Sequence, residues 1–197
     1  MRLGRVEVTG GFLLLLAWLN YLDRALLVPM ALAACGAHEL GHIMAIWLLG
    51  GAIKEIRLTA VGAELVLARP LAYWQEGLAA LAGPGINLLL AMAGCHFDLT
   101  FSGLNLALAL FNLLPVGRLD GGRAVYCTLA LLAGPEAADR VGKWLDFLCT
   151  AVVTAAGLFL AVWGGNITLL LASCWLLAVF LQNIGNRTCQ RGRKKVQ

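Results

Sequence analysis

Residues 31–49, ALAACGAHELGHIMAIWLL, form an apolar run of about 20 residues, which is long enough for one helix to cross a bilayer. The run contains His38-Glu39-Leu40-Gly41-His42. Histidines at i and i+4 lie one turn apart on the same face of a helix, so both can bind one metal ion, and the glutamate beside the first can reach a reacting water. Ionisable side chains inside an apolar helix are costly unless they are paired or bound to a metal. The pattern therefore predicts a membrane helix that carries a metal site. The alternative is a buried polar cluster that only packs helices together.

The composition agrees with a membrane location. Of the 197 residues, 60% are hydrophobic and 13% charged, and the mean hydropathy is +0.81. An average soluble domain is about one quarter charged. These values exclude a soluble globule, a disordered chain, collagen and a coiled coil. The length allows about six spanning helices in a single domain over 1–197, without room for a further soluble domain of usual size.

We expect an all-α polytopic membrane protein. The apolar runs predict helices at about 10–22, 25–49, 72–95, 100–116, 143–163 and 166–184. Arg2 and Arg5 precede the first run as in a signal peptide, but no small-x-small cleavage pattern follows it, so we expect a retained helix.

The basic residues predict the orientation of this map. If the N-terminus is cytoplasmic, every Lys and Arg except Arg24 falls on the cytoplasmic side. Both termini are therefore expected in the cytoplasm. The basic tail at 185–197 would face anionic lipid. Nucleic-acid binding is not indicated, because no aromatic-basic module accompanies the tail.

Residues 52–68 differ from the spanning segments. Lys54, Glu55, Arg57 and Glu64 interrupt them, 56–59 alternate with period two, and Gly62 stands between two apolar runs. These features allow either a β-hairpin at about 53–67 or an ordinary cytoplasmic loop.

A catalytic zinc site usually has three protein ligands, so a third ligand is required. His96 is the one other histidine, but it falls at the outer end of the 72–95 helix, where we expect an interfacial role. Asp120 follows a helix broken by Pro115 and Gly117 and would emerge at the cytoplasmic level of the two histidines. Its alternative role is to cap a helix at Gly121. Weaker acidic candidates are Glu64, Glu76 and Asp98.

The six cysteines predict neither a zinc site nor a disulfide framework. No C-x-x-C pair is present, and most cysteines lie in apolar runs. We expect them to pack as small hydrophobic residues.

Three motifs in this order resemble the site-2 protease family of intramembrane zinc metalloproteases, and most of all its compact bacterial sporulation-type branch. The motifs are HELGH at 38–42, GPGIN at 83–87 and NLLPVGRLDG at 112–121. The resemblance implies that His38, His42 and Asp120 bind one Zn²⁺ and that Glu39 is the general acid/base. It further implies that Asn112, and with it Asn87, helps to hold substrate or oxyanion, whereas interhelical hydrogen bonding is the alternative for both.

The resemblance also favours the hairpin, which in this family is membrane-associated and can pair with an extended substrate strand. We therefore expect a zinc-dependent intramembrane endopeptidase of the bacterial inner membrane. It would cleave a membrane-tethered transmembrane protein near the cytoplasmic side, and so release a regulatory fragment or clear remnant peptides. Membrane lipids and an inhibitory or activating membrane protein are further expected partners. The sequence contains no PDZ or CBS domain, so regulation by nucleotide is not indicated.

Two other functions compete with this expectation. A zinc carrier or sensor without hydrolytic activity would use several ligand sites along a path, often with internal symmetry, and the sequence has one cluster and no visible repeat. A different class of membrane metalloprotease would need a downstream glutamate as third ligand, for which Glu136 is the candidate.

Overall fold

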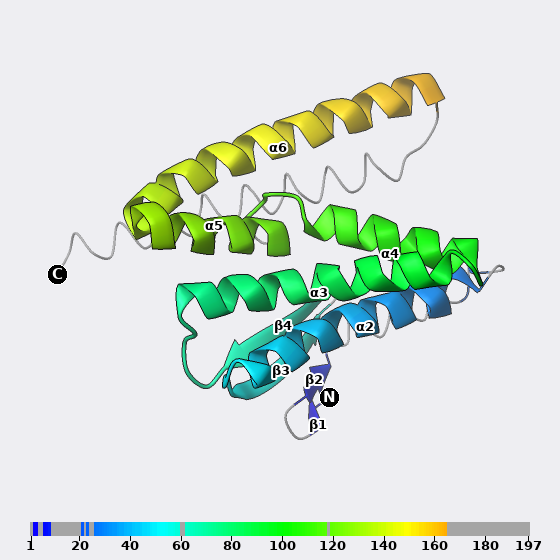
Figure 1. The fold of residues 1–197 in the computed structure, drawn as a ribbon. Coiled ribbons are helices and arrows are strands. Elements are labelled where there is room, and N and C mark those ends of the chain that lie inside the picture. Colours follow the sequence, from blue (N-terminus) through cyan, green and yellow to red (C-terminus); the bar gives the residue numbers. More distant parts are fainter. Residues whose placement is uncertain are drawn as a thin grey trace.

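The computed structural model describes residues 2–3, 6–8, 21, 23, 26–59, 62–117 and 119–164. The elements in chain order are β1 (Arg2–Leu3), β2 (Val6–Val8), α2 (Leu27–Leu48), β3 (Ile53–Thr59), β4 (Gly62–Leu67), α3 (Tyr73–Gly94), α4 (Leu99–Asn112), α5 (Asp120–Ala133) and α6 (Pro135–Gly164). Apart from Tyr21, the expected helices at 10–22 and 166–184 and the tail at 185–197 lie outside these ranges. In Figure 1, α3 lies between α2 on one side and α4 and α5 on the other, and α6 packs on α5.

Two predicted helices agree closely with the structure. The range 25–49 corresponds to α2, and 72–95 corresponds to α3. Near the start of α2, the Asp23 carboxylate accepts a hydrogen bond from the Val28 N–H at 2.8 Å. At the start of α3, the Gln75 side chain accepts from the Ala72 N–H and donates to the Leu49 carbonyl, which joins this end to the end of α2. Local capping therefore fixes both helices where their apolar runs begin.

The helices bury small residues and expose large ones. The buried apolar set is rich in alanine (Ala34, Ala79, Ala80, Ala91, Ala109, Ala124, Ala130, Ala138). Large apolar side chains are exposed instead, for example Trp47, Leu132 and Trp163. Small residues let helices approach closely inside a bilayer, where burying large side chains brings no hydrophobic gain. This distribution is that of a membrane protein.

Three of the described helices are long and apolar enough to cross a bilayer, namely α2, α3 and α6. The helix expected at 100–116 is α4, which ends at Asn112 because Pro115 prevents its continuation. With 14 residues it is shorter than a standard span. The chain is thus mostly helical with three candidate spans, and six spans remain a prediction.

The hairpin expected at 53–67 is present. Strands β3 and β4 pair antiparallel from Ile53 with Leu67 to Thr59 with Gly62. The sheet is larger than expected, because β2 adds parallel to β3 and β1 pairs with β2. The predicted hairpin is therefore confirmed, and the two N-terminal strands that extend its sheet were not predicted. Strands of two and three residues are too short to show a period-two pattern.

The segment after Asp120 also differs from the expectation. The predicted helices leave the polar, glycine-rich stretch between 116 and 143 unassigned, but the structure forms α5 and the first turns of α6 there. Gly121 and Gly122 are not signs of a loop, since a Cβ at either position would collide with the Leu113 or Val116 carbonyl. The charged residues Asp139 and Arg140 lie on the exposed side of α6 before its most apolar part. Close backbone packing at Gly121 and Gly122 explains why α5 was not predicted. The exposed charged residues explain why the first turns of α6 were not predicted.

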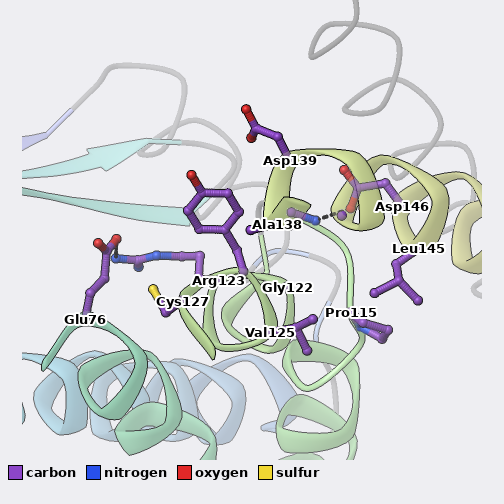
Figure 2. A pocket seen from close by; sticks show the side chains of 13 residues that line it. Glu76, Pro115, Gly122, Arg123, Val125, Cys127, Ala138, Asp139, Leu145 and Asp146 are labelled. Carbon is purple, nitrogen blue, oxygen red and sulfur yellow. Dashed lines mark hydrogen bonds and ion pairs between the residues drawn. The ribbon is translucent and has the colours of Figure 1, made fainter. Parts of the chain in front are cut away.

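The connection between α4 and α5 is held from α6. The Asp146 carboxylate, which Figure 2 labels, is 6% exposed, and it accepts a hydrogen bond from the Gly117 N–H at 2.5 Å. Val116 and Leu119 pack beside it as a small buried cluster. A buried carboxylate on a backbone N–H is a strong, directional contact. It fixes the backbone that leads into α5.

We predict that Asp146→Ala destabilises the protein by about 1–3 kcal/mol, because the Gly117 N–H loses its acceptor. The measurement is thermal unfolding of the purified protein in detergent. Asp139→Ala, at an exposed position on the same helix, is the matched control and should leave the melting temperature nearly unchanged. Equal melting temperatures for the two variants would contradict the role of Asp146.

Candidate metal centre

His38 and His42 lie on the buried face of α2. That face also presents Ala34, Gly41 and Ile46, and each histidine is 6% exposed. The two Nε2 atoms are 3.1 Å apart, and the rings meet edge to face with centroids 4.7 Å apart. The i, i+4 spacing thus places both imidazoles side by side on one face of α2, as the sequence predicted.

Asp120 completes a triangle with the two histidines. It is the first residue of α5, and its Oδ2 lies 3.0 Å from His38 Nε2 and 3.2 Å from His42 Nε2. The three residues are buried, and they form the group of the described chain whose donor atoms lie close enough together to hold a metal ion. The structure therefore brings together the two histidines and the acid that the sequence singled out.

The protonation of the His42 ring follows from its neighbour. Its Nδ1 lies 2.7 Å from the Ala79 carbonyl oxygen, which can only accept, so Nδ1 carries a proton. The Nε2 atom of the neutral ring then directs a lone pair at Asp120. His38 is arranged in the same way, with Nδ1 2.6 Å from Asn87 Oδ1. Two imidazole lone pairs and a carboxylate converge on one point, which requires either added protons or a cation.

This donor set fits Zn²⁺. Two imidazole nitrogens and one carboxylate oxygen are a known ligand set for catalytic zinc, which keeps a fourth position for water or substrate. In a tetrahedral site with bonds of about 2.0–2.1 Å, two ligand atoms lie about 3.3–3.4 Å apart. The separations of 3.0–3.2 Å observed here are close to that value. Small movements of the rings would complete such a site.

The Asp120 carboxyl group is in the charged form that a metal ligand needs. Burial raises the pKa of this carboxyl, but the imidazoles of His38 and His42 beside it outweigh burial and lower the pKa to about 2. The group is therefore ionised at neutral pH. Metal ligands must be deprotonated, so no proton has to leave Asp120 before it binds.

Glycines shape the surface beneath the two rings. A Cβ at Gly83 on α3 would overlap with His42 Nε2 and lie 3.0 Å from His38 Cε1. At Gly41 on α2, a Cβ would lie 2.9 Å from the Ala82 carbonyl oxygen. The backbones of α2 and α3 can approach at the site because both positions lack a side chain. The sequence showed Gly83 as part of a motif, but it did not reveal this packing role.

Glu39 lies on α2 beside His38. Its side chain is half-buried and within electrostatic range of His38, His42, Asp120 and Arg123. It is not part of the group of three donors. This position allows the carboxylate to act beside the ligands, and its role as general acid/base stays a prediction.

The two predicted asparagines are placed differently. The Asn87 side chain is fully buried and bonds to His38 Nδ1, on the side of that ring away from Asp120. Asn112 is half-buried at the end of α4, where its Nδ2 donates to the Leu108 carbonyl at 3.1 Å. Their expected contacts with substrate or oxyanion stay predictions.

Other candidate ligands lie apart from the group of three. His96 is exposed beyond the end of α3, Asp98 caps α4, and Glu136 is exposed in the first turn of α6. Glu76 pairs with Arg123 at 3.3 Å on the wall of a cavity of about 240 Å³ between α3, α5 and α6. Figure 2 shows this pair and Asp146 on the cavity wall, which none of the three donor residues lines.

Among the buried polar residues that sequence reasoning missed are Asn105 and Asp146. Asn105 is fully buried in α4. Asn87 was singled out by the GPGIN motif, whereas the signal that could have found Asn105 is an asparagine within an apolar helix. Asp146 is an acid near the start of the helix expected at 143–163, and its cost inside an apolar segment indicates a partner.

Comparisons with known proteins agree with this geometry. No family model matches the chain. A relative named "Putative zinc metalloprotease sll0528", from Synechocystis sp., is 32% identical over 188 residues, which cover 86% of this chain and 48% of the relative. "Putative zinc metalloprotease Rip3", from Mycobacterium tuberculosis, is 31% identical over 186 residues, which cover 78% of this chain and 45% of the relative. The chain thus spans about half the length of these curated relatives.

A solved structure shares the fold. The site-2 protease from Methanocaldococcus jannaschii superposes with a TM-score of 0.66 at 23% identity, and the match covers 92% of each chain. The chain therefore has the fold of a site-2 protease. The chain is thus similar to proteins named as putative zinc metalloproteases and shares the fold of a site-2 protease.

We predict that Gly83→Ala weakens zinc binding at least about tenfold, because the added methyl group displaces both imidazoles. The measurement is zinc affinity by competition with a chelator in detergent. Gly85→Ala is the matched control, since a Cβ there meets nothing within 4 Å on the same helix. Unchanged affinity in Gly83→Ala would show that the rings do not need this space.

Proposed function

We propose that this chain is a member of the site-2 protease family and acts as a zinc-dependent intramembrane endopeptidase. The observation that carries the proposal is the triangle of His38 Nε2, His42 Nε2 and Asp120 Oδ2, with sides of 3.0–3.2 Å, inside a bundle of apolar helices. These three residues are the proposed ligands of one Zn²⁺. A buried site of this composition, in a chain with zinc metalloprotease relatives, supports hydrolysis more than packing alone.

The residues around the triangle have distinct proposed roles. When bound, Zn²⁺ supplies a Lewis acid that activates water and polarises the scissile carbonyl. Glu39, beside the ligands on α2, accepts a proton from the attacking water and returns it to the leaving amine. Asn112, at the end of the helix that precedes Asp120, holds the substrate carbonyl or oxyanion.

The substrate binds in an extended form in this proposal. A helical substrate keeps its carbonyls in its own hydrogen bonds, so it must unwind before cleavage. In the described sheet, β3 is paired on both sides, by β2 and by β4, so β4 is the edge strand of the hairpin. Addition of a substrate strand along β4 would hold the unwound segment.

The substrate class is a membrane-tethered protein cut near the cytoplasmic side of a bacterial inner membrane. His38 and His42 lie in the second half of α2, and the basic residues Lys54 and Arg57 follow in β3. Basic residues favour the cytoplasmic side. Cleavage at this level would release a cytoplasmic fragment or clear a remnant peptide.

We predict that Glu39→Gln keeps zinc but lowers cleavage by about 10²- to 10⁴-fold, because the amide cannot accept the proton. The measurement combines zinc per chain with cleavage, in proteoliposomes, of a panel of single-span proteins that carry a helix-breaking Pro-Gly pair near the cytoplasmic end. Glu136→Gln is the matched control, at an exposed position of α6, and should cleave like the wild type.

Two results would contradict the proposal. Undiminished cleavage by Glu39→Gln would remove this residue from the reaction. Zinc binding in the wild type without cleavage of any panel member would favour the carrier or sensor.

A further inference from the structure

Two asparagines are fully buried side by side between apolar helices. Asn87 on α3 and Asn105 on α4 have no exposed surface. Their side chains are joined by a hydrogen bond of 2.8 Å from Asn87 Nδ2 to Asn105 Oδ1. A buried amide costs free energy unless all of its polar atoms are bonded. Such a pair therefore needs an explanation beyond the packing of two helices.

Backbone carbonyls fix which way each amide faces. Asn105 Nδ2 donates to the Phe101 carbonyl at 2.9 Å, and Asn87 Nδ2 donates to the Ala34 carbonyl at 3.1 Å. Carbonyl oxygens only accept, so each amide must turn its nitrogen toward its carbonyl. The Asn105 oxygen consequently faces Asn87 and takes the second proton of the Asn87 amide. Both protons of Asn87 Nδ2 are then used.

This arrangement determines the protonation of His38. With its nitrogen committed to Ala34 and Asn105, Asn87 presents its oxygen to His38 Nδ1 at 2.6 Å. An oxygen acceptor there keeps the proton on Nδ1 and leaves the Nε2 lone pair directed at Asp120. If the amide turned over, its nitrogen would meet Nδ1, and the ring proton would move to Nε2. A ring protonated at Nε2 cannot bind a metal through that atom.

We infer that Asn105 is a positioning residue of the metal centre: together with the Ala34 carbonyl it holds the Asn87 amide, and so it helps to keep His38 in the tautomer that binds metal. The inference rests on the proposed zinc site. Asn105 touches none of the three ligands in the described hydrogen bonds, and its influence passes across three helices, α4, α3 and α2. His42 takes its orientation independently from the Ala79 carbonyl, so the effect is confined to one ligand.

A purely structural role predicts a different pattern. If Asn105 only joined α4 to α3, its loss would lower stability without a specific effect on the metal. Ser102 provides the comparison, because its Oγ, on the same helix, donates to the Ala91 carbonyl of α3 at 2.6 Å. Both residues connect the same two helices, but only Asn105 is bonded to the partner of His38.

The test measures zinc affinity by chelator competition, the visible spectrum of the Co²⁺ form, and the melting temperature without metal, all on the full chain in detergent. Asn105→Leu, of similar size but without polar atoms, should weaken zinc binding about 10- to 100-fold and alter the Co²⁺ spectrum. Ser102→Ala should lower only the melting temperature. Asn105→Asp keeps the acceptor facing Asn87 and should retain most of the affinity.

The outcomes separate the inference from the proposed function. A wild-type chain that binds no zinc overturns the metal site itself. Tight zinc binding in the wild type with the same affinity and Co²⁺ spectrum in Asn105→Leu overturns only the role of Asn105. Equal losses in Asn105→Leu and Ser102→Ala would also overturn it. If Asn105→Leu does not fold, Asn105→Ser takes its place, since the shorter hydroxyl does not reach Asn87.

Discussion

The rest of the structure depends on holding three acceptor atoms together. His38 Nε2, His42 Nε2 and Asp120 Oδ2 lie within 3.2 Å of one another and away from water. The Ala79 carbonyl and Asn87 keep the Nδ1 protons of the two histidines in place, so the Nε2 lone pairs converge with the Asp120 carboxylate. Such a cluster is unfavourable in a low-dielectric interior unless positive charge lies among its members. A zinc ion bound there would satisfy the cluster and supply a Lewis acid.

The packing of the helices holds this cluster of three atoms in place. Helix α3 contributes no ligand, but it packs against α2, α4 and α5 and carries the carbonyl, the amide and the glycine on which both histidines rest. Asp120 depends on a different support, because Asp146 of α6 holds the backbone that leads into α5. Backbone groups and buried side chains of several helices thus fix one small triangle. Side chains that hold ligands in place commonly affect metal affinity almost as strongly as the ligands do.

The sequence predicted those parts of the structure that local patterns encode. The i, i+4 histidines, the broken helix before Asp120 and the alternation at 56–59 each act over a few residues, and the structure shows the expected helix, cluster and hairpin. The rest depends on distant contacts. Gly121 and Gly122 resemble a loop until the carbonyls of Leu113 and Val116 are placed against them, and β2 becomes a strand only beside β3. The hydrogen bond from Asn87 to Asn105 joins residues of separate helices, which no local pattern reveals.

The most direct test of the central claim is the zinc content per chain of the purified protein, compared among the wild type, His38→Ala, His42→Ala and Asp120→Ala. The account predicts about one zinc in the wild type and a marked loss in each variant, because each removes one of three ligands. Asp139→Ala, which removes an exposed acid outside the site, should keep the metal. Full zinc content in Asp120→Ala would contradict the account, since the third ligand would then lie elsewhere and the joining of α5 to α2 through a metal would be wrong.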